Sequence, residues 1–147
     1  MADVYSADRL KYFTMESSDF LVIGSGLAGL IYALDVAAKG TVTVLTKSES
    51  FEGSTRYAQG GIATVMSAGD TFDSHINDTL EAGAGLCHLD TVQLAVREGP
   101  SAIAHLTELG VEFDRTTSGA FELGREGGHS ARRILHAADA TGAEIQR

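Results

Sequence analysis

The chain has 147 residues and a formal net charge of −9, with 11 Lys and Arg against 20 Asp and Glu. A hydrophobic content of 44% and a charged content of 21% are typical of a globular domain and exclude a disordered chain. The acidic balance argues against a nucleic-acid-binding protein, because phosphate contacts need clustered Lys and Arg, and the single Cys87 excludes an internal disulfide and a cysteine-based zinc site.

Residues 1–18 mix acidic, basic and apolar side chains and lack the long apolar centre of a secretory signal. We therefore expect a loose, flexible leader. No uninterrupted apolar run reaches the length of a transmembrane helix, so we expect no membrane partner.

A glycine turn between a strand and a helix follows the leader. Phe20 to Ile23 predict a buried strand, and Gly24, Gly26 and Gly29 have the spacing of the dinucleotide-binding fingerprint. The first glycine permits a tight turn, the second allows close approach to a pyrophosphate, and the third lets helix and strand pack closely. The N–H groups at the helix start would bind the pyrophosphate. The other interpretation is a glycine-rich turn that binds nothing.

A helix from Leu30 to Ala38 and a strand over Thr41–Thr46 complete a parallel βαβ unit of Rossmann type. An acidic residue is expected after the second strand, where it would bind ribose hydroxyls. Lys47 stands there instead, with Glu49 two residues on. This departure weakens an NAD interpretation and leaves NADP open, because a lysine can contact a 2′-phosphate; Lys47 could equally be a solvated surface residue.

A second glycine loop runs from Gly53 to Ala63 around the adjacent Gly60 and Gly61. Its small and hydroxylic side chains suit close backbone approach to a flat ligand or its phosphates. A plain glycine hairpin is the alternative.

The segment of about residues 70–123 is predicted to be an α+β insertion. It holds the pattern of three helices followed by two strands around a turn. Asp73 and Asp90 are expected to cap the first two helices, and Gly99-Pro100 is expected to separate the second helix from the third. The first helix is predicted from its cap at Asp73 to a stop at Gly83, the other two over 91–98 and 101–109, and the strands over 111–114 and 120–123.

A third glycine loop, Gly124–Ser130, carries both charge signs and His129 in a tight space. A helix is predicted from about Ser130 through Ala140, interrupted by Thr141-Gly142. The chain stops at Arg147 in a helical stretch without a capping residue, which is typical of a truncated chain.

Few side chains suit protein-based catalysis. The five histidines form no close i, i+4 pair, so no metal site is expected, and no nucleophile motif is present. His75, His88 and His105 are predicted to lie on the surface or on helix faces. A nucleotide cradle without a nucleophile favours chemistry performed by a bound cofactor.

The three glycine loops together resemble a known family. The segments DFLVIGSGLAGL, VTVLTKSESFEGSTRYAQGGIA and LGREGGHSARRILHAADATG are similar to the N-terminal part of the L-aspartate oxidase family, within the succinate dehydrogenase and fumarate reductase flavoprotein superfamily. DSHINDTLEAGAGL and LGVEFD are similar as well. The resemblance runs from about Asp19 to the end and implies FAD as cofactor. It implies FAD contacts with Gly24, Ser25, Gly26, Leu27, Ala28, Gly29, Lys47, Ser54, Thr55, Arg56, Tyr57, Ala58, Gln59, Gly60 and Gly61.

Two positions distinguish members of this superfamily. Ser54 stands where membrane-bound relatives carry a flavin-linking histidine, so the resemblance implies non-covalent FAD. Glu126 stands where those relatives generally lack an acid. A carboxylate is the natural partner of the α-ammonium that distinguishes aspartate from succinate, so we expect Glu126 to orient the substrate. His129 and Ser130 are expected to contact a substrate carboxylate.

Glu126 also has a purely structural interpretation. It could form a salt bridge with Arg125, Arg132 or Arg133.

The resemblance implies oxidation of L-aspartate to iminoaspartate in the cytoplasm, as the first step of quinolinate and NAD synthesis. Oxygen or fumarate would accept the electrons, and quinolinate synthase would be a partner. The family's catalytic arginines and histidine would lie beyond Arg147, so the chain alone is expected to be inactive.

The fold expected is α/β: a flexible leader over 1–18, then a Rossmann-like FAD-binding βαβ unit with the start of an inserted α+β capping region, over 19–147. Two other functions stay open. One is a soluble fumarate reductase or succinate dehydrogenase-like flavoprotein, and the other is a non-catalytic nucleotide-binding remnant.

Overall fold

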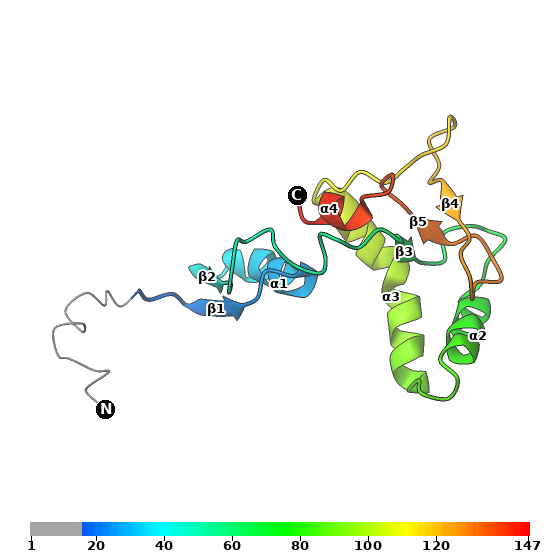
Figure 1. The fold of residues 1–147 in the computed structure, drawn as a ribbon, viewed down its shortest axis with the longest axis horizontal. Coiled ribbons are helices and arrows are strands. Elements are labelled where there is room, and N and C mark those ends of the chain that lie inside the picture. The colour runs from blue at the N-terminus through cyan, green and yellow to red at the C-terminus, as the bar shows by residue number, and fades with distance from the viewer. Residues whose placement is uncertain (1–15) are drawn as a thin grey trace, which may run out of the picture. The chain divides into compact units, whose positions relative to one another are not determined.

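The structure, a computed structural model, describes residues 16–147 (Figure 1). The chain divides into two compact units, Met1–Ser50 and Phe51–Arg147, called here the first and the second unit. Most of the predicted leader lies outside the described residues.

The first unit confirms the predicted βαβ unit. Strand β1 (Phe20–Ile23) pairs in parallel with β2 (Val42–Leu45), and α1 (Leu27–Ala37) connects them. Phe20 is the register partner of Val42, and Ile23 is that of Leu45. Helix α1 begins at Leu27, directly after the turn residue Gly26 and three residues before the predicted start at Leu30. The chain is already in helical geometry where it leaves the turn.

Side-chain hydrogen bonds stabilise the start of the first unit. Asp19 Oδ2 accepts hydrogen bonds from Thr41 N at 2.8 Å and from Thr41 Oγ1 at 2.9 Å. Both donors hold the pKa of Asp19 below its usual range. The two residues thereby join the chain before β1 to the chain before β2.

The second unit contains two long helices that pack against each other, α2 (Phe72–Ala82) and α3 (Leu89–Glu108) (Figure 1). The predicted cap of α2 is wrong by two residues. Thr71 is the N-cap and accepts a hydrogen bond from Ser74 N at 3.1 Å, while Asp73 lies in the first turn. Thr and Asp are both good N-caps, and the cap position falls on Thr71 because the first helical residue is Phe72.

The predicted break at Gly99-Pro100 is also wrong, because α3 runs continuously through Pro100 from an N-cap at His88, not at Asp90. A proline inside a helix costs about 3 kcal/mol. Here Val96, Ile103 and Leu106 lie buried along one face on both sides of the proline. Burial of each such side chain stabilises by roughly 1.5–3 kcal/mol, so the continuous apolar face outweighs the proline.

The second unit also contains a small antiparallel sheet of the order β3-β5-β4: β3 (Ile62–Ala63), β5 (Ile134–Leu135) and β4 (Leu123–Gly124). The helix predicted from Ser130 to Ala140 is therefore wrong. Ile134 and Leu135 are buried and pair on both sides, which satisfies their backbone groups without a helix. Helix α4 (Thr141–Ile145) begins where an interruption was predicted.

The two strands predicted over 111–114 and 120–123 form no ladder in the described chain. Their segments meet at one isolated bridge, Arg115 with Phe121, and regular pairing starts only at Leu123. Val111 and Phe113 are buried all the same. Asp114 N donates to His136 O at 2.8 Å and so joins this segment to the chain that leaves β5.

No helix in residues 16–147 combines the length and the apolar character that crossing a bilayer requires.

Candidate functional site

The fingerprint turn of the first unit has the geometry that its glycines predict. Gly24 has a φ of +108°, in the left-handed region that favours glycine. A Cβ added at Gly29 would lie 2.2 Å from Gly24 O, so helix and turn approach too closely for any other residue. No side chain caps the N-terminus of α1 within the described residues. The turn thus presents a helix N-terminus suited to a phosphate.

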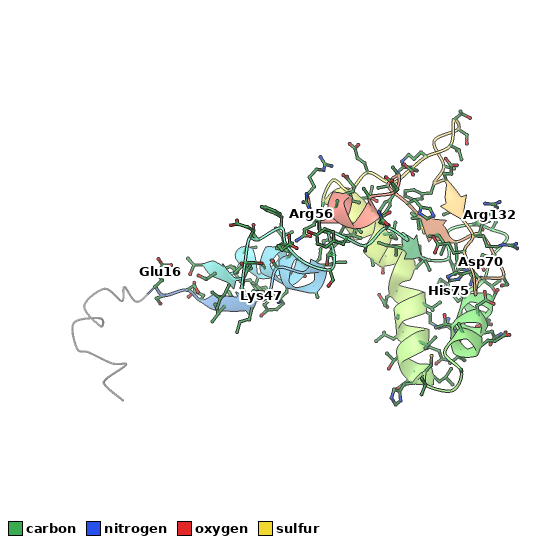
Figure 2. The ribbon with its side chains drawn as sticks, in the orientation of Figure 1. Glu16, Lys47, Arg56, Asp70, His75 and Arg132 are labelled. Carbon is green, nitrogen blue, oxygen red and sulfur yellow. The ribbon has the colours of Figure 1, made fainter. Side chains whose placement is uncertain are left out.

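Lys47 follows β2 by two residues and is exposed (Figure 2). Because β1 and β2 are parallel and Ile23 pairs with Leu45, the glycine turn and Lys47 both leave the carboxyl edge of the sheet. Ligands of open α/β sheets bind at that edge. The arrangement suits a cation that contacts a nucleotide bound at the turn.

The part of the second glycine loop that is expected to contact FAD, Ser54–Gly61, belongs to the second unit. Ala58 N donates to Thr55 O at 3.1 Å, and Gly142 N at the start of α4 donates to Ala58 O at 2.8 Å. A Cβ at Gly142 would lie 1.7 Å from Thr55 O, so only glycine allows this contact. The loop is therefore held by the backbone of α4, and Ser54 and Gly60 stay exposed.

Two side-chain contacts also order the start of this loop. The Tyr57 hydroxyl donates to Glu52, with oxygen distances of 2.9 and 3.0 Å. That hydrogen bond raises the pKa of Tyr57. The Arg56 guanidinium lies 5.3 Å from the centre of the Phe51 ring.

Glu126 of the third loop lies against the second loop. Its Oε2 is 3.7 Å from the place that a Cβ of Gly60 would take. Glu126 is exposed and forms no ion pair with any residue of the described chain. The structure therefore brings the expected substrate-orienting carboxylate to the expected flavin loop, and the alternative interpretation, a salt bridge to a neighbouring arginine, is not seen among the described residues.

Arg133 is instead the centre of a buried network. Its Nε and Nη2 donate to Asp70 Oδ2 and Oδ1 at 2.8 and 2.7 Å, and its Nη1 donates to Asp78 Oδ2 at 2.7 Å. The side chains of Arg133 and Asp70 are 0% exposed. Asp70 and His75 lie at the end of α2 nearest the small sheet (Figure 2).

His129 and Ser130 join this network. Ser130 donates to Asp78 Oδ2 through its backbone N at 2.8 Å and through its hydroxyl at 2.7 Å. His129 Nδ1 lies 3.5 Å from Arg133 Nη1, and the ring stands edge-on to that of His75 at a centroid distance of 5.7 Å. Both expected substrate contacts are thus tied to α2.

His75, predicted to lie on the surface or on a helix face, lies on α2 and is buried. Its Nδ1 has no hydrogen-bond partner among the described residues. Burial lowers the pKa of His75 because charging the ring would cost solvation, and the nearby Arg133 acts in the same direction. The His75 ring on α2 thus contacts the third loop through the His129 ring.

Little in the sequence predicts this network around Arg133. Asp70 and Arg133 are 63 residues apart, and the local pattern around Arg133 predicts a helix where the chain enters β5. The hydrogen bond from Ser130 N, together with those from the Ser130 hydroxyl and Arg133, lowers the pKa of Asp78 from 3.8 to about 2.

This low pKa predicts an acid-dependent loss of stability. Asp78 stabilises the fold fully above its unfolded pKa of 3.8, and that contribution disappears as the pH falls through about 2. Asp78→Asn should lower the free energy of unfolding by about 1–2 kcal/mol at pH 6, allowing for solvent screening. Urea denaturation at pH 6, 4 and 2 measures this, and an equal gap between variant and wild type at all three values would contradict it.

The comparisons with known proteins agree with this geometry. The family described as FAD binding domain matches residues 19–147. The chain is 55% identical over 129 residues to L-aspartate oxidase 2-b, chloroplastic, of Nicotiana tabacum, which covers 88% of this chain and 20% of that protein. It is 52% identical over 133 residues to L-aspartate oxidase of Streptomyces coelicolor, with 89% of this chain and 23% of that protein covered. The chain spans about a fifth to a quarter of the length of such relatives.

Solved structures agree as well. A Mycobacterium smegmatis Sdh1 complex with UQ1 matches 90% of this chain and 23% of its own, with a TM-score of 0.83 and 34% identity. A quinol fumarate reductase of E. coli matches 88% of this chain and 23% of its own, with a TM-score of 0.81 and 30% identity. On its sequence and its fold, the chain belongs to the FAD-binding domain family.

Proposed function

We propose that the complete protein oxidises L-aspartate to iminoaspartate with FAD, and that this chain forms the N-terminal part of its cofactor and substrate site. The observation that carries the proposal is the Glu126 carboxylate beside Gly60, which forms no ion pair within residues 16–147. An acid next to a flavin loop suits a substrate that carries an ammonium group. The relatives that bear the name L-aspartate oxidase support the same activity.

The residues present fit FAD. The fingerprint turn has room for a pyrophosphate, since a Cβ at Gly24 would meet nothing within 4 Å and α1 has no side-chain cap. Gly24–Gly29 and Lys47 would hold the dinucleotide, and Ser54–Gly61 would contact the flavin. The serine hydroxyl at position 54 would leave FAD non-covalent. When bound, FAD supplies the hydride acceptor that no side chain can replace.

The chain's own residues orient the substrate in this proposal. Glu126 binds the α-ammonium group of aspartate and so rejects dicarboxylates that lack it. His129 contributes a ring N–H to a substrate carboxylate. Ser130 lies next to that contact, with both of its hydrogen-bond donors on Asp78.

The wider physiological role is part of the proposal. Iminoaspartate would pass to quinolinate and NAD synthesis, with quinolinate synthase as the partner enzyme. Oxygen or fumarate would reoxidise the flavin, and the reaction would take place in the cytoplasm. The isolated chain would be inactive.

A fumarate reductase or succinate dehydrogenase-like activity is the second candidate, because the solved structures named above come from such enzymes. The complete protein, purified with its flavin, separates the two. L-Aspartate should be oxidised with release of peroxide in air, and succinate should not. Succinate oxidation at a comparable rate would favour the second candidate, and a colourless protein that oxidises neither would indicate a non-catalytic remnant.

A further inference from the structure

The third loop has little regular structure of its own. β4 ends at Gly124 and β5 begins at Ile134, and Arg125, Glu126, Gly127 and Gly128 between them are all exposed. Within the described chain, residues 125–129 make one hydrogen bond among themselves, from His129 N to Glu126 O at 3.3 Å. The position of Glu126 therefore depends on what holds the two ends of the loop.

One end is held by the sheet and the other by α2. Arg133 N donates to Gly124 O at 3.0 Å and closes the base of the loop. At the far end of the turn, Asp78 Oδ2 accepts three hydrogen bonds, two from Ser130 and one from Arg133 Nη1, at 2.7–2.8 Å. We call these contacts of Asp78 with Ser130 and Arg133 the Asp78 clamp.

The clamp is rigid because its other members are fixed. The bidentate bond to the buried Asp70 carboxylate holds the Arg133 guanidinium in one orientation. Ser74 Oγ, one helical turn before Asp78, lies 3.0 Å from Ser130 Oγ and 3.2 Å from Arg133 Nη2. Ser130 is thus anchored to two successive turns of α2.

We infer that Asp78 is a positioning residue, which fixes the Glu126–Ser130 turn on α2 and thereby sets where the Glu126 carboxylate stands beside Gly60. Since Glu126 lies only four positions before the anchored Ser130, a displaced Ser130 displaces the carboxylate as well. This inference rests on the proposed role of Glu126 in binding the α-ammonium group. It assigns to α2, outside the glycine loops, a part in the choice of substrate.

The test uses Asp78→Asn in the complete flavin-bound protein, which keeps the shape of the side chain and removes its charge. Asp73→Asn is the matched control, since Asp73 lies on the same helix with an 86% exposed side chain and only a 3.8 Å ion pair to Arg97. Hydrogen exchange of residues 125–130 should quicken about tenfold in Asp78→Asn and stay unchanged in Asp73→Asn. Unchanged exchange in Asp78→Asn would overturn the clamp, whether or not the protein oxidises aspartate.

Kinetics then test the link to Glu126. We expect kcat/KM for aspartate to fall about tenfold, mainly through KM, while the affinity for succinate, measured by flavin absorbance, falls less, by about threefold, because succinate loses only the carboxylate contact of His129 on the displaced turn. A merely structural role would weaken both ligands equally, and that result would overturn the positioning role. If the wild-type protein does not oxidise aspartate, the proposed function is wrong, and the hydrogen-exchange measurement still tests the Asp78 clamp.

Discussion

Arg133→Met is expected to lower the free energy of unfolding of the second unit by about 3–5 kcal/mol, because removal of one partner leaves a buried charge uncompensated. Asp70, whose side chain is 0% exposed, would lose both hydrogen bonds to the guanidinium. Asp78 would keep its bonds from Ser130 and lose the third. A loss of this size is a large part of the 5–15 kcal/mol that typically stabilises a domain.

Urea denaturation followed by circular dichroism measures this loss, and Arg97→Met is the matched control. Arg97 pairs with Asp73 at 3.8 Å, with side chains 55% and 86% exposed, so its removal should cost less than about 0.5 kcal/mol. The double variant Arg133→Met with Asp70→Leu should recover part of the loss, since no unpaired charge stays at position 70. A loss below about 1 kcal/mol in Arg133→Met would show that the pair adds little to the fold.

The first unit was predictable because its signals are local. Gly24, Gly26 and Gly29 mark the turn within six residues, and the β-branched stretch around Val42–Leu45 marks the second strand. Both follow from backbone sterics and side-chain shape. The structure confirms both elements and their parallel pairing.

The second unit was less predictable because its determinants are distant in sequence. Ile134 and Leu135 form a strand only because β3 and β4 pair with them on both sides. Pro100 stays helical only because apolar residues before and after it share one buried face. No window of ten residues contains that information.

The candidate site divides in the same way. The glycine loops could be selected from the sequence because their motifs resemble those of a known family. Glu126 could be selected because its charge stands at a position that distinguishes members of that family. The contacts that hold Glu126 in place could not, because they join α2 to a loop more than 50 residues away. Residues that bind a ligand are found by their chemistry, whereas residues that position them are found only by the fold.

Glu126→Gln is expected to reduce kcat/KM for L-aspartate about 10- to 100-fold in the complete protein, because a hydrogen bond between charged groups contributes about 1.5–3 kcal/mol. Glutamine fills the same volume and can still accept a hydrogen bond, but it offers the α-ammonium group no opposite charge. Since Glu126 forms no ion pair within residues 16–147, its neutralisation strands no arginine and should leave stability within about 0.5 kcal/mol of wild type.

Steady-state kinetics with aspartate and a flavin absorbance titration with succinate measure the effect, with Glu122→Gln as control. Glu122 is exposed four residues earlier, and its backbone N–H rather than its carboxylate bonds to Asp114 O. Succinate carries no ammonium group, so Glu126→Gln should leave its affinity unchanged or raise it, which makes the ratio of the two ligands the decisive quantity. Equal losses of affinity for both ligands would mean that Glu126 shapes the loop and does not bind the amino group. A loss confined to aspartate would place the choice of substrate in a single carboxylate, that of Glu126 beside Gly60.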